Sequence, residues 1–600
     1  TLSALGMLVG LVAVIPTSDT FTSVLMGLPG SSASQATVLD GFPLSQQGQA
    51  ARALAAAFTA SLVGGLVGAL ILTLFVQIAR PLILTFGSAE LFMLALLGLS
   101  MVGVLSGASL LKGLAACGLG LVAGSIGGAP ATGEFRMTFG IDYLYDGLPL
   151  VIVGIGLFAF PEIVDLLRRN RAIAADGLLA GSWLEGVRDV FRHWFLVLRC
   201  SAIGTLIGAI PGLGGTVVDW IAYGHVVQTA KDKSRFGKGD IRGVLAPESA
   251  NNAKEGGGLV PTLLFGIPGS GAMAVFLGGM VLIGIEAGPA MVSADLDLTY
   301  TIIWSLALAN VLGAGSCMLL ARPIARLTAI PFNLLAPFMI MVVSFAAAQA
   351  TRSFMDLAIL FGVGIVGVLL KRFGWSRPAF LIGFVLAPQA EGYLNLAVQF
   401  YGFGMLARPG VLIILAIIAV SVWLGARNRG GLGVVSHGDA PAGPVEDRRP
   451  QVWFIGGAMA VLAYTLWSSL RLSPLGSMFP VSVGVATLGL CAYLFWALKF
   501  GDVNNGANFD SERQVADEPV GSLWQNVGWF VVFLVATGLL GFIPGSALFF
   551  IAFLRLKGQC SVQLTATLTV AAVAILLLFT NVLIVELPEG LLSRFVEFRG

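Results

Sequence analysis

The sequence predicts an all-α polytopic membrane protein, and its composition is the first observation behind that class. Apolar residues make up 57% of the 600 residues, charged residues only 11%, and the mean hydropathy is +0.91. Soluble domains use about 25% charged residues. Second, apolar windows of about 20 residues, the length that crosses a bilayer core, recur along nearly the whole chain. We count roughly 14 to 16 transmembrane helices.

The 78 glycines, spread through the apolar windows, are the third observation. Membrane helices use glycine for close approach and for breaks that neighbouring protein supports, so we expect tightly packed helices that include broken or re-entrant ones. The clearest spans are Ala53 to Val76, Leu91 to Leu110, Leu148 to Phe160, Thr301 to Leu320 and Val411 to Leu424.

A polar, Gly/Pro-rich stretch divides the chain into two modules. It covers residues 426–450 and lacks apolar periodicity, so it is expected to be a linker. A large module, residues 1–425, precedes it, and a small module of four spans, residues 451–600, follows it. The expected small-module spans are Trp453 to Leu470, Phe479 to Leu498, Val527 to Phe553 and Leu564 to Val585.

Lys and Arg residues concentrate at Arg168 to Arg171, Lys231 to Arg242, Lys371 to Arg372 and Arg427 to Arg449. The positive-inside rule assigns these segments, and with them the linker, to the cytoplasmic side. The alternative is that some of them flank re-entrant segments and carry no topological information. A net charge of +2 argues against a nucleic-acid partner. The sequence has no GxxxxGK[ST] phosphate loop, which disfavours ATP-driven transport.

The five cysteines are isolated and lie mostly in apolar stretches, so they are expected to be core residues rather than zinc ligands or disulfide partners. They are Cys117, Cys200, Cys317, Cys491 and Cys560. The chain starts at Thr1, not at Met, and no signal peptide opens it, so the numbering is expected to begin after the original N-terminus.

An internal repeat is visible in the large module. Gly27 to Ala33 (GLPGSSA) recurs as Gly266 to Ala272 (GIPGSGA), and each copy follows an apolar-Pro-Thr triplet. The repeat halves are placed at about residues 1–165 and 185–425. Duplicated halves with Gly/Pro-interrupted helices are typical of secondary transporters, whose substrate site lies between the breaks. A chance match of short Gly/Pro strings is the alternative.

Three Pro-Gly breaks are expected, at the two repeat copies and at Gly208 to Thr216 (GAIPGLGGT). Proline beside glycine removes a backbone donor and ends a helix. The half-helix that restarts offers unpaired N–H groups and the positive end of its dipole, which suits a carboxylate. Ser31, Thr216 and Ser270 would add hydroxyl donors, and the opposed carbonyl ends would suit a coupling cation such as Na⁺. Packing kinks are the alternative.

Polar residues near these breaks are further candidates. Asn251 and Asn252 are costly in hydrocarbon unless hydrogen-bonded, so they are expected to contact a cation, the substrate or a broken backbone; a solvated loop is the alternative. Asp219 follows the second break by about one turn and is expected to carry a proton or to help hold Na⁺. The other ionisable candidates, either functional or capping helices at the interface, are Asp19, Asp40, Asp142, Glu162, His225, Asp356 and Glu391.

The large module resembles the large membrane subunit of the tripartite tricarboxylate transporter family. In the second half the resemblance is carried by GAIPGLGGT, FGKGDIRGVLAPESANNA and GGGLVPTLLFGIPGSGAMAVFLGGM, and in the first half by PGSSASQATVLDGFPLSQQGQAARAL, RMTFG and GLFAFPE. GFVLAPQAE, at Gly383 to Glu391, and Ala407-Arg408-Pro409 also fit. The small module is similar to the four-span small subunit of the same family, chiefly in SPLGSMFP at Ser473 to Pro480.

The resemblance implies a multi-pass protein of the bacterial inner membrane that takes up small carboxylates, receives them from a periplasmic solute-binding protein and moves by an elevator-like or rocking motion. The coupling ion would be Na⁺ or H⁺, with no other cofactor, and assembly into a homodimer is compatible with this interpretation. The implied coupling-ion candidates are Asp219, Asn251 and Thr17. The implied substrate-binding residues are Pro29, Gly30, Ser31, Pro211, Gly212, Gly214, Gly215, Thr216, Asn251, Asn252, Pro268, Gly269, Ser270 and Gly271.

Three features depart from the family pattern. The family usually has a further Pro-Gly break upstream in the first repeat, and none precedes Gly27 in this sequence. Asp219 and His225 stand where small or different polar residues are expected. The two subunits are fused in one chain, which fixes their ratio at one to one.

Two other functions are weighed against a carrier. Gly237-Lys238-Gly239-Asp240 spells the GxGD signature of intramembrane aspartyl proteases, with Tyr145-Asp146 as the nearest partner motif. Asp240 lies in a basic stretch, whereas two carboxylates that share a proton need a dry site. An organic-anion channel remains the other alternative, which saturable, gradient-dependent uptake would distinguish from a carrier.

Overall fold

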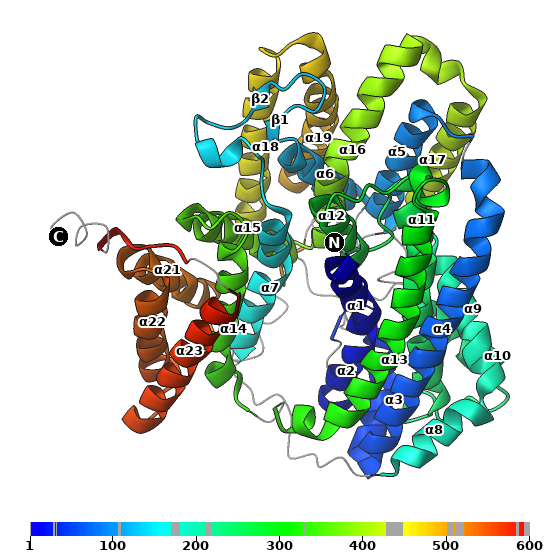
Figure 1. Ribbon diagram of the computed structural model, residues 1–600, viewed down its shortest axis with the longest axis vertical. Coiled ribbons are helices and arrows are strands. Elements are labelled where there is room, and N and C mark those ends of the chain that lie inside the picture. Colours follow the sequence, from blue (N-terminus) through cyan, green and yellow to red (C-terminus); the bar gives the residue numbers. More distant parts are fainter. Residues whose placement is uncertain are drawn as a thin grey trace.

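The computed structural model describes residues 2–27, 30–31, 33–83, 85–105, 110–169, 181–210, 218–327, 330–427, 448–500, 509–511, 521–583 and 587–592. Helices make up nearly all regular structure in this part of the chain (Figure 1). The described strands are β1 (Gly127–Gly128) and β2 (Phe135–Arg136), which pair antiparallel. The predicted all-α polytopic class is confirmed.

The number of spans depends on how the shorter helices are counted. Ten helices among the described residues are long and apolar enough to cross a membrane, or eleven if the pair α8 (Trp183–Arg192) and α9 (Trp194–Gly208), bent by 76°, is one span. Six further apolar helices have 10–17 residues. Our count of roughly 14 to 16 therefore includes helices that are too short to cross a bilayer by the length criterion.

The first of three helix groups surrounds α11 (Arg242–Phe265), which is buried from Gly243 to Leu264. It also contains α8 and α9. Its other helices are α1 (Leu2–Ser18), α2 (Thr20–Met26), α3 (Gln35–Leu44), α4 (Ala50–Ile83), α10 (Val218–Thr229) and α13 (Leu296–Leu327). α4 and α9 both pack along α11.

Glycines explain why α11 can lie so close to its neighbours. Gly64 and Gly68 of α4 face the α11 backbone on one side, and Gly204 and Gly208 of α9 face it on the other. A methyl group at any of these four positions would collide with α11 backbone atoms. Both pairs have the small-xxx-small spacing that brings membrane helices into close contact.

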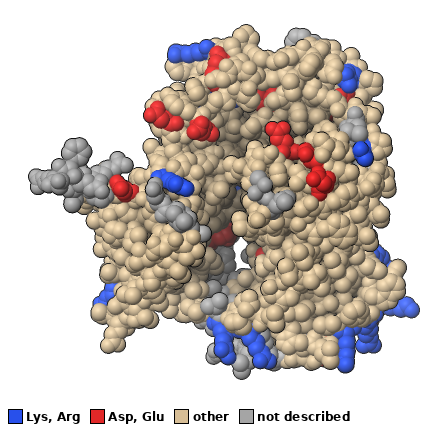
Figure 2. All heavy atoms as spheres, viewed as in Figure 1, with Lys and Arg blue, Asp and Glu red and all other residues tan. Residues whose placement is uncertain are grey.

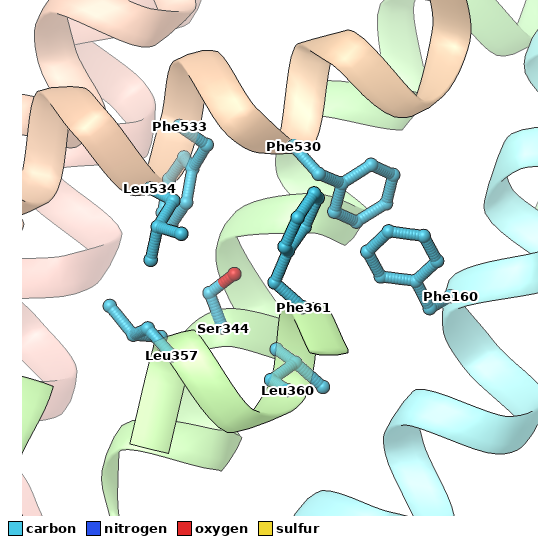
Figure 3. Close-up of a pocket in the computed structure, with 8 residues that line it drawn as sticks. All are labelled: Phe160, Ser344, Leu357, Leu360, Phe361, Phe530, Phe533 and Leu534. Atoms are coloured by element: carbon cyan, nitrogen blue, oxygen red, sulfur yellow. The ribbon is translucent and has the colours of Figure 1, made fainter. Parts of the chain in front are cut away.

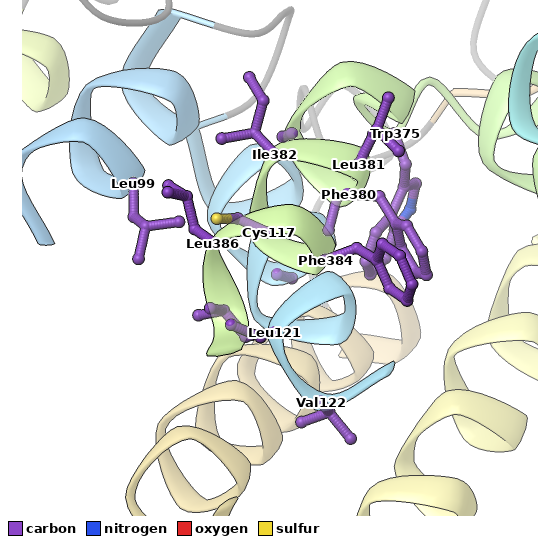
Figure 4. Close-up of a cluster of buried hydrophobic side chains, with 14 of the residues drawn as sticks. Leu99, Cys117, Leu121, Val122, Trp375, Phe380, Leu381, Ile382, Phe384 and Leu386 are labelled. Carbon is purple, nitrogen blue, oxygen red and sulfur yellow. The ribbon is translucent and has the colours of Figure 1, made fainter. Parts of the chain in front are cut away.

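The second group contains α5 (Ser88–Leu105), α6 (Leu110–Gly124), α16 (Arg377–Tyr401) and α17 (Pro409–Arg427). Its core lies between α6 and α16, where Cys117 and Leu121 meet Phe380 and Phe384 (Figure 4). All five cysteines are free and buried, as predicted.

The third group contains α7 (Leu150–Arg169), α14 (Phe332–Ala348) and α15 (Phe354–Arg372). Between the first group and the other two lies α12 (Gly271–Leu282), which contacts α1, α7 and α16. The remaining short helices of the large module are η1 (Ser45–Gln49), η2 (Asp142–Leu144), η3 (Pro289–Val292) and η4 (Gly402–Ala407).

The internal repeat is visible in how the helices pair. In the first half, α1 together with α2 corresponds to α11 of the second, and α3 to α7 correspond in order to α12 to α16. α1 packs on α13 as α11 packs on α4, α6 packs on α16 as α15 packs on α7, and α5 packs on α16 as α14 packs on α7. Gly27 and Gly266 end their helices in the same left-handed conformation, both with φ 67°. This agreement favours duplicated halves over a chance match of short strings.

The small module is divided into two separate helix sets. Its helices are α18 (Arg449–Ser469), α19 (Pro474–Phe500), α21 (Leu523–Leu540), α22 (Phe542–Leu556) and α23 (Val562–Leu583). α18 and α19 form a hairpin that packs on α6, whereas α21 to α23 pack together and cover α7, α14 and α15 (Figure 1). The single span predicted for Val527 to Phe553 is wrong, because Gly541, with φ 90°, divides it into α21 and α22.

The contact between the second helix set and the large module is aromatic and apolar. Phe530 of α21 lies against Phe160 of α7 with ring centroids 3.9 Å apart. Around this pair, a small apolar cavity is bounded by Phe361 of α15 and Phe533 of α21 (Figure 3). The second helix set is thus held by burial of apolar surface.

The first helix set is held by polar contacts at the β1–β2 hairpin. Glu134 accepts hydrogen bonds from Ser473, at 3.0 Å from its N–H and at 2.6 Å from its hydroxyl, and these bonds hold the pKa of Glu134 below its usual range. Arg136 forms a buried, bidentate ion pair with Glu391 of α16 and also donates to the carbonyl oxygen of Gly476. Three of the sequence segments that carry the family resemblance therefore meet at one point.

Charge is distributed unevenly over the surface. In Figure 2, Lys and Arg side chains gather along the lower end, where Figure 1 shows α8, and most visible Asp and Glu side chains lie in the upper half. The positive-inside rule assigns the lower end to the cytoplasm. The predicted linker falls mostly on residues 428–447, which lie outside the described residues.

Candidate functional site

The first predicted break follows α2. The chain turns at Gly27, and Gly30 then lies against the junction of α1 and α2, where a Cβ would come within 2.9 Å of the Asp19 Cα. The hydroxyl of Ser31 accepts from the N–H of Ala33 at 3.2 Å, which orders the turn into α3. Pro29 lies outside the described residues.

The second predicted break follows α9, which ends at Gly208; the next described helix, α10, begins at Val218. Five predicted site residues lie outside the described residues in this interval, namely Pro211, Gly212, Gly214, Gly215 and Thr216.

The third predicted break follows α11. The helix ends at Gly266, and after Pro268 and Gly269 a new helix, α12, begins at Gly271. Ser270 caps that helix, because its hydroxyl accepts a hydrogen bond from the N–H of Met273 at 3.3 Å. The hydroxyl expected to serve a ligand is therefore engaged by its own helix.

The structure brings the edges of the three breaks together. Asp219, in the first turn of α10, accepts a hydrogen bond from the N–H of Ala36, in the first turn of α3, at 2.9 Å. This contact joins the first break to the second. A Cβ on Gly269 would lie 3.2 Å from the carbonyl oxygen of Gly208, which joins the third break to the second. The breaks therefore converge on one region beside α11.

Asn251 and Asn252 lie on α11 and are each 1% exposed, so the alternative of a solvated loop is wrong. The amide nitrogen of Asn252 donates to the hydroxyl of Thr17 at 2.8 Å and to the amide oxygen of Asn310 at 2.9 Å. Among the described residues, neither polar atom of the Asn251 side chain, nor the amide oxygen of Asn252, has a hydrogen-bond partner. Buried amides without partners are rare and indicate a place for another polar group.

Two buried carboxylates near the breaks are held by backbone N–H groups. Asp219 accepts from Ala36 and from Trp220, at 2.9 and 2.8 Å. Asp40 accepts from the N–H groups of Gly239 and Asp240, at 2.8 and 2.9 Å, and from the hydroxyl of Tyr223 at 2.9 Å. N–H donors favour the charged form of a carboxylate. These two side chains therefore tie α3 to α10 and to the segment that precedes α11.

Our sequence interpretation missed three charged residues of α11, Glu248, Lys254 and Glu255. All are buried, with 0%, 6% and 3% exposure. Lys254 pairs with Glu255, and its carbonyl oxygen abuts Gly208 at the edge of the second break. The helical period could have found the two glutamates, because positions 248, 252 and 255 recur every three to four residues and fall on one face of a helix.

Most other ionisable candidates lie in structural contacts. Asp356 caps α15 together with Ser353 and accepts from Tyr143, and Glu162 pairs with Lys371 and Arg377. These contacts match the capping and interface alternatives. Asp142 is exposed on the surface, and His225, on α10, has a buried ring nitrogen without a partner.

The GxGD carboxylate, Asp240, is an ion-pair partner in a polar loop. Arg242 contacts both of its oxygens, at 3.0 and 2.7 Å. Burial raises the pKa of Asp240, but the hydrogen bonds from Arg242 outweigh it and leave the pKa below its usual range. A carboxylate held in its charged form by an arginine does not share a proton with a second one, as an aspartyl protease requires.

The fold and the site define a class: a polytopic α-helical membrane protein in which broken helices from two repeats enclose buried polar residues. The comparison with protein families assigns the chain within it. Residues 1–382 match the tripartite tricarboxylate transporter TctA family, and residues 451–588 match the tripartite tricarboxylate transporter TctB family. The chain belongs to the TctA family and carries the small TctB component in the same polypeptide.

Two curated relatives come from Agrobacterium vitis. An "Uncharacterized 52.8 kDa protein in TAR-I ttuC' 3'region" is 32% identical over 378 residues, which are 63% of this chain and 75% of the relative. An "Uncharacterized protein in TAR-II ttuC' 3'region" is 32% identical over 194 residues, which are 32% of this chain and 80% of that relative. No solved structure matches the chain.

Proposed function

We propose that this protein is the membrane component of a cation-coupled secondary transporter that imports small di- or tricarboxylates across the bacterial inner membrane by alternating access. A periplasmic solute-binding protein would deliver the substrate, as family membership suggests. The observation that carries the proposal is the convergence of three helix breaks on the buried polar face of α11, next to Lys254.

The substrate carboxylate would be held by two kinds of donor. Helices α3, α10 and α12 all begin after the breaks, and their first N–H groups and dipoles favour an anion. Lys254 would supply the positive charge, and its ammonium would stay paired with Glu255 while no substrate is bound. Asn251, whose amide is buried and finds no partner in the described part of the chain, would contact the substrate directly.

The charge balance of the site supports coupling to a cation. The described residues place three carboxylates, Asp19, Asp219 and Glu255, around the single ammonium of Lys254. An anion entering such a site is repelled unless positive charge enters with it. Uptake of substrate together with Na⁺ or H⁺ satisfies this requirement, and a substrate-selective anion channel does not explain it.

The test is uptake into proteoliposomes that contain the full chain, with the binding protein supplied. Labelled succinate, malate and citrate are offered with a Na⁺ gradient, with a pH gradient and with neither. A carrier gives saturable uptake that requires one of the gradients. Uptake that rises linearly with substrate and ignores both gradients would identify a channel instead.

A further inference from the structure

Glu248 is a carboxylate enclosed by hydroxyl groups in the interior of the protein. Its exposure is 0%, and the hydroxyls of Thr20 on α2, Thr37 on α3 and Ser61 on α4 donate to it at 2.9, 2.7 and 3.0 Å. None of the ion pairs formed between described residues includes Glu248. A buried carboxylate without a counter-charge is costly at membrane depth unless something neutralises it.

The hydroxyl shell can serve both protonation states of Glu248. A hydroxyl both donates and accepts, so when the carboxyl binds a proton, one hydroxyl can turn and accept from it. Backbone N–H groups cannot turn in this way. Asp40 and Asp219 each accept from such groups, whereas all three side chains that donate to Glu248 are hydroxyls.

The charged groups on the surrounding helices favour a proton on Glu248. The Asp19 carboxylate, at the junction of α1 and α2, interacts electrostatically with Glu248. A negative charge nearby disfavours the charged form of a carboxyl group. α4 has no charged residue between Arg52 and Arg80, and α12 has none. Of the other helices packed against α11, α1 has no charged residue and α13 has none between Asp297 and Arg322. Asp40 on α3 and Asp219 on α10 accept from N–H groups, Arg199 on α9 donates to Thr229, and Glu90 on α5 accepts from Arg408; α10 also carries His225. Lys254 and Glu255 pair with each other two turns along α11.

The geometry points to Glu248 as the site that takes up the coupling ion, and to a proton as that ion, an inference that rests on the proposed transport function. The hydroxyl oxygens contact the carboxylate oxygens directly, at 2.7–3.0 Å, so the shell is closed around a proton-sized ligand. One proton binds one carboxylate oxygen of Glu248 on one side of the membrane and leaves it on the other.

Proton binding would act on the first break. Thr20 and Thr37 stand on the two sides of it, on α2 and α3, and both donate to the same carboxylate. The charged form holds both hydroxyls as donors, whereas the protonated form turns one of them. Binding of a proton to Glu248 therefore changes the hydrogen bonds that hold α3 in place. The first turn of α3 in turn contacts Asp219, at the second break.

Infrared difference spectroscopy of the full chain in lipid vesicles tests the assignment without transport. The expected result is a carbonyl band of a buried, protonated carboxyl that disappears as the pH rises and that is absent in Glu248→Gln. Asp142→Asn, which removes an exposed carboxyl, keeps the band. A band that is unchanged in Glu248→Gln would mean that Glu248 is charged throughout, and would overturn the inference.

A milder substitution keeps the test decisive if the Glu248→Gln protein does not fold. Ser61→Ala removes one donor to the charged form, so the pH at which the band disappears should rise by about half a unit to one unit. Thr59→Val on the same helix removes a buried hydroxyl that donates to Ala55, and should leave that pH unchanged. No shift in Ser61→Ala would contradict the inference.

Uptake separates the two proposals. Exchange of labelled for unlabelled citrate, malate or succinate by the wild-type protein tests transport alone, and its absence would remove the proposed function while the infrared result stands. If exchange occurs, Glu248→Gln should lose the acceleration of uptake by an inward pH gradient. A Glu248→Gln protein that still responds to that gradient would place proton coupling elsewhere.

Discussion

At the scale of the residue, Lys254 is the side chain on which recognition of a carboxylate depends most. Its ammonium is buried and pairs with Glu255, and its carbonyl oxygen lies against Gly208 at the edge of the second break. A charge-assisted hydrogen bond contributes about 1.5–3 kcal/mol. The residue was overlooked in the sequence because the segment around it was open to interpretation as a solvated loop, and only the neighbouring helices bury it.

We predict that Lys254→Gln combined with Glu255→Gln lowers the affinity for the transported carboxylate by roughly 10- to 150-fold. Both residues are changed together because removing one partner of a buried ion pair is strongly destabilising. The measurement is the concentration dependence of uptake in proteoliposomes. Lys231→Gln, in an exposed position, is the matched control. An unchanged concentration dependence would remove Lys254 from the binding site.

Gly269 allows the third break to approach the second. A Cβ there would touch the carbonyl oxygen of Gly208 and the Cα of Gly258, at 3.2 and 3.4 Å, so a larger side chain must push the two breaks apart. We predict that Gly269→Leu abolishes uptake while membrane insertion is retained. Gly315→Leu on α13, where no atom lies within 4 Å of a Cβ, should transport normally. Normal uptake by Gly269→Leu would contradict the helix-break site.

The residues of the site were predicted unequally. The helix ends at Gly27, Gly208 and Gly266 follow from local backbone chemistry, since each precedes a Pro-Gly pair by a few residues, and such a pair removes a backbone donor and permits non-helical dihedrals. Thr17, which accepts from Asn252, and the three hydroxyl partners of Glu248 lie more than 180 positions away, on α1, α2, α3 and α4, and the other partner of Asn252, Asn310 on α13, lies 58 positions away. No local pattern reports such contacts.

At the scale of the element, α11 is a membrane-embedded helix that keeps its polar residues because protein surrounds it. α4 and α9 approach it through glycines on both sides, so its carboxylates and amides never meet lipid. This packing also explains why α11 is too polar to be recognised as a membrane span by its hydropathy, although every residue from Gly243 to Leu264 is buried.

We predict that Gly208→Ala destabilises the protein by about 1–3 kcal/mol, because the added methyl collides with the carbonyl oxygen of Lys254. The measurement is the thermal midpoint of the detergent-solubilised full chain by size exclusion. Gly224→Ala on α10 has open space around the methyl and serves as the control. Equal midpoints for the two variants would show that α9 and α11 can separate without cost.

At the scale of the whole molecule, the small module contacts the large module at two places. The α18–α19 hairpin packs on α6, and α21 with α22 packs on α7, α14 and α15. In the pairing of the two repeats, α6 corresponds to α15 and α5 to α14, so the two helix sets cover related parts of the two halves. The group around α11, which contains the breaks, is left largely uncovered by these contacts.

The polar contact of the first helix set depends on the buried pair Arg136 and Glu391, which are 2% and 1% exposed. We predict that Glu391→Gln alone lowers stability by about 3–5 kcal/mol, since it leaves the arginine charge buried, and that Arg136→Met added to it restores part of the loss. Thermal midpoints of the three proteins measure this. A double variant less stable than Glu391→Gln would contradict the argument.

The sequence by itself determined the membrane class, the two modules, the duplicated motif and the positions at which helices break, because hydropathy, glycine and proline act within a few residues of themselves. Tertiary structure alone decided that the breaks converge beside α11, that Glu248 and Lys254 are buried, and that the small module splits over two surfaces. Those outcomes depend on which distant helices pack together. A glycine in the sequence shows that a helix can be approached closely, but not which helix approaches it.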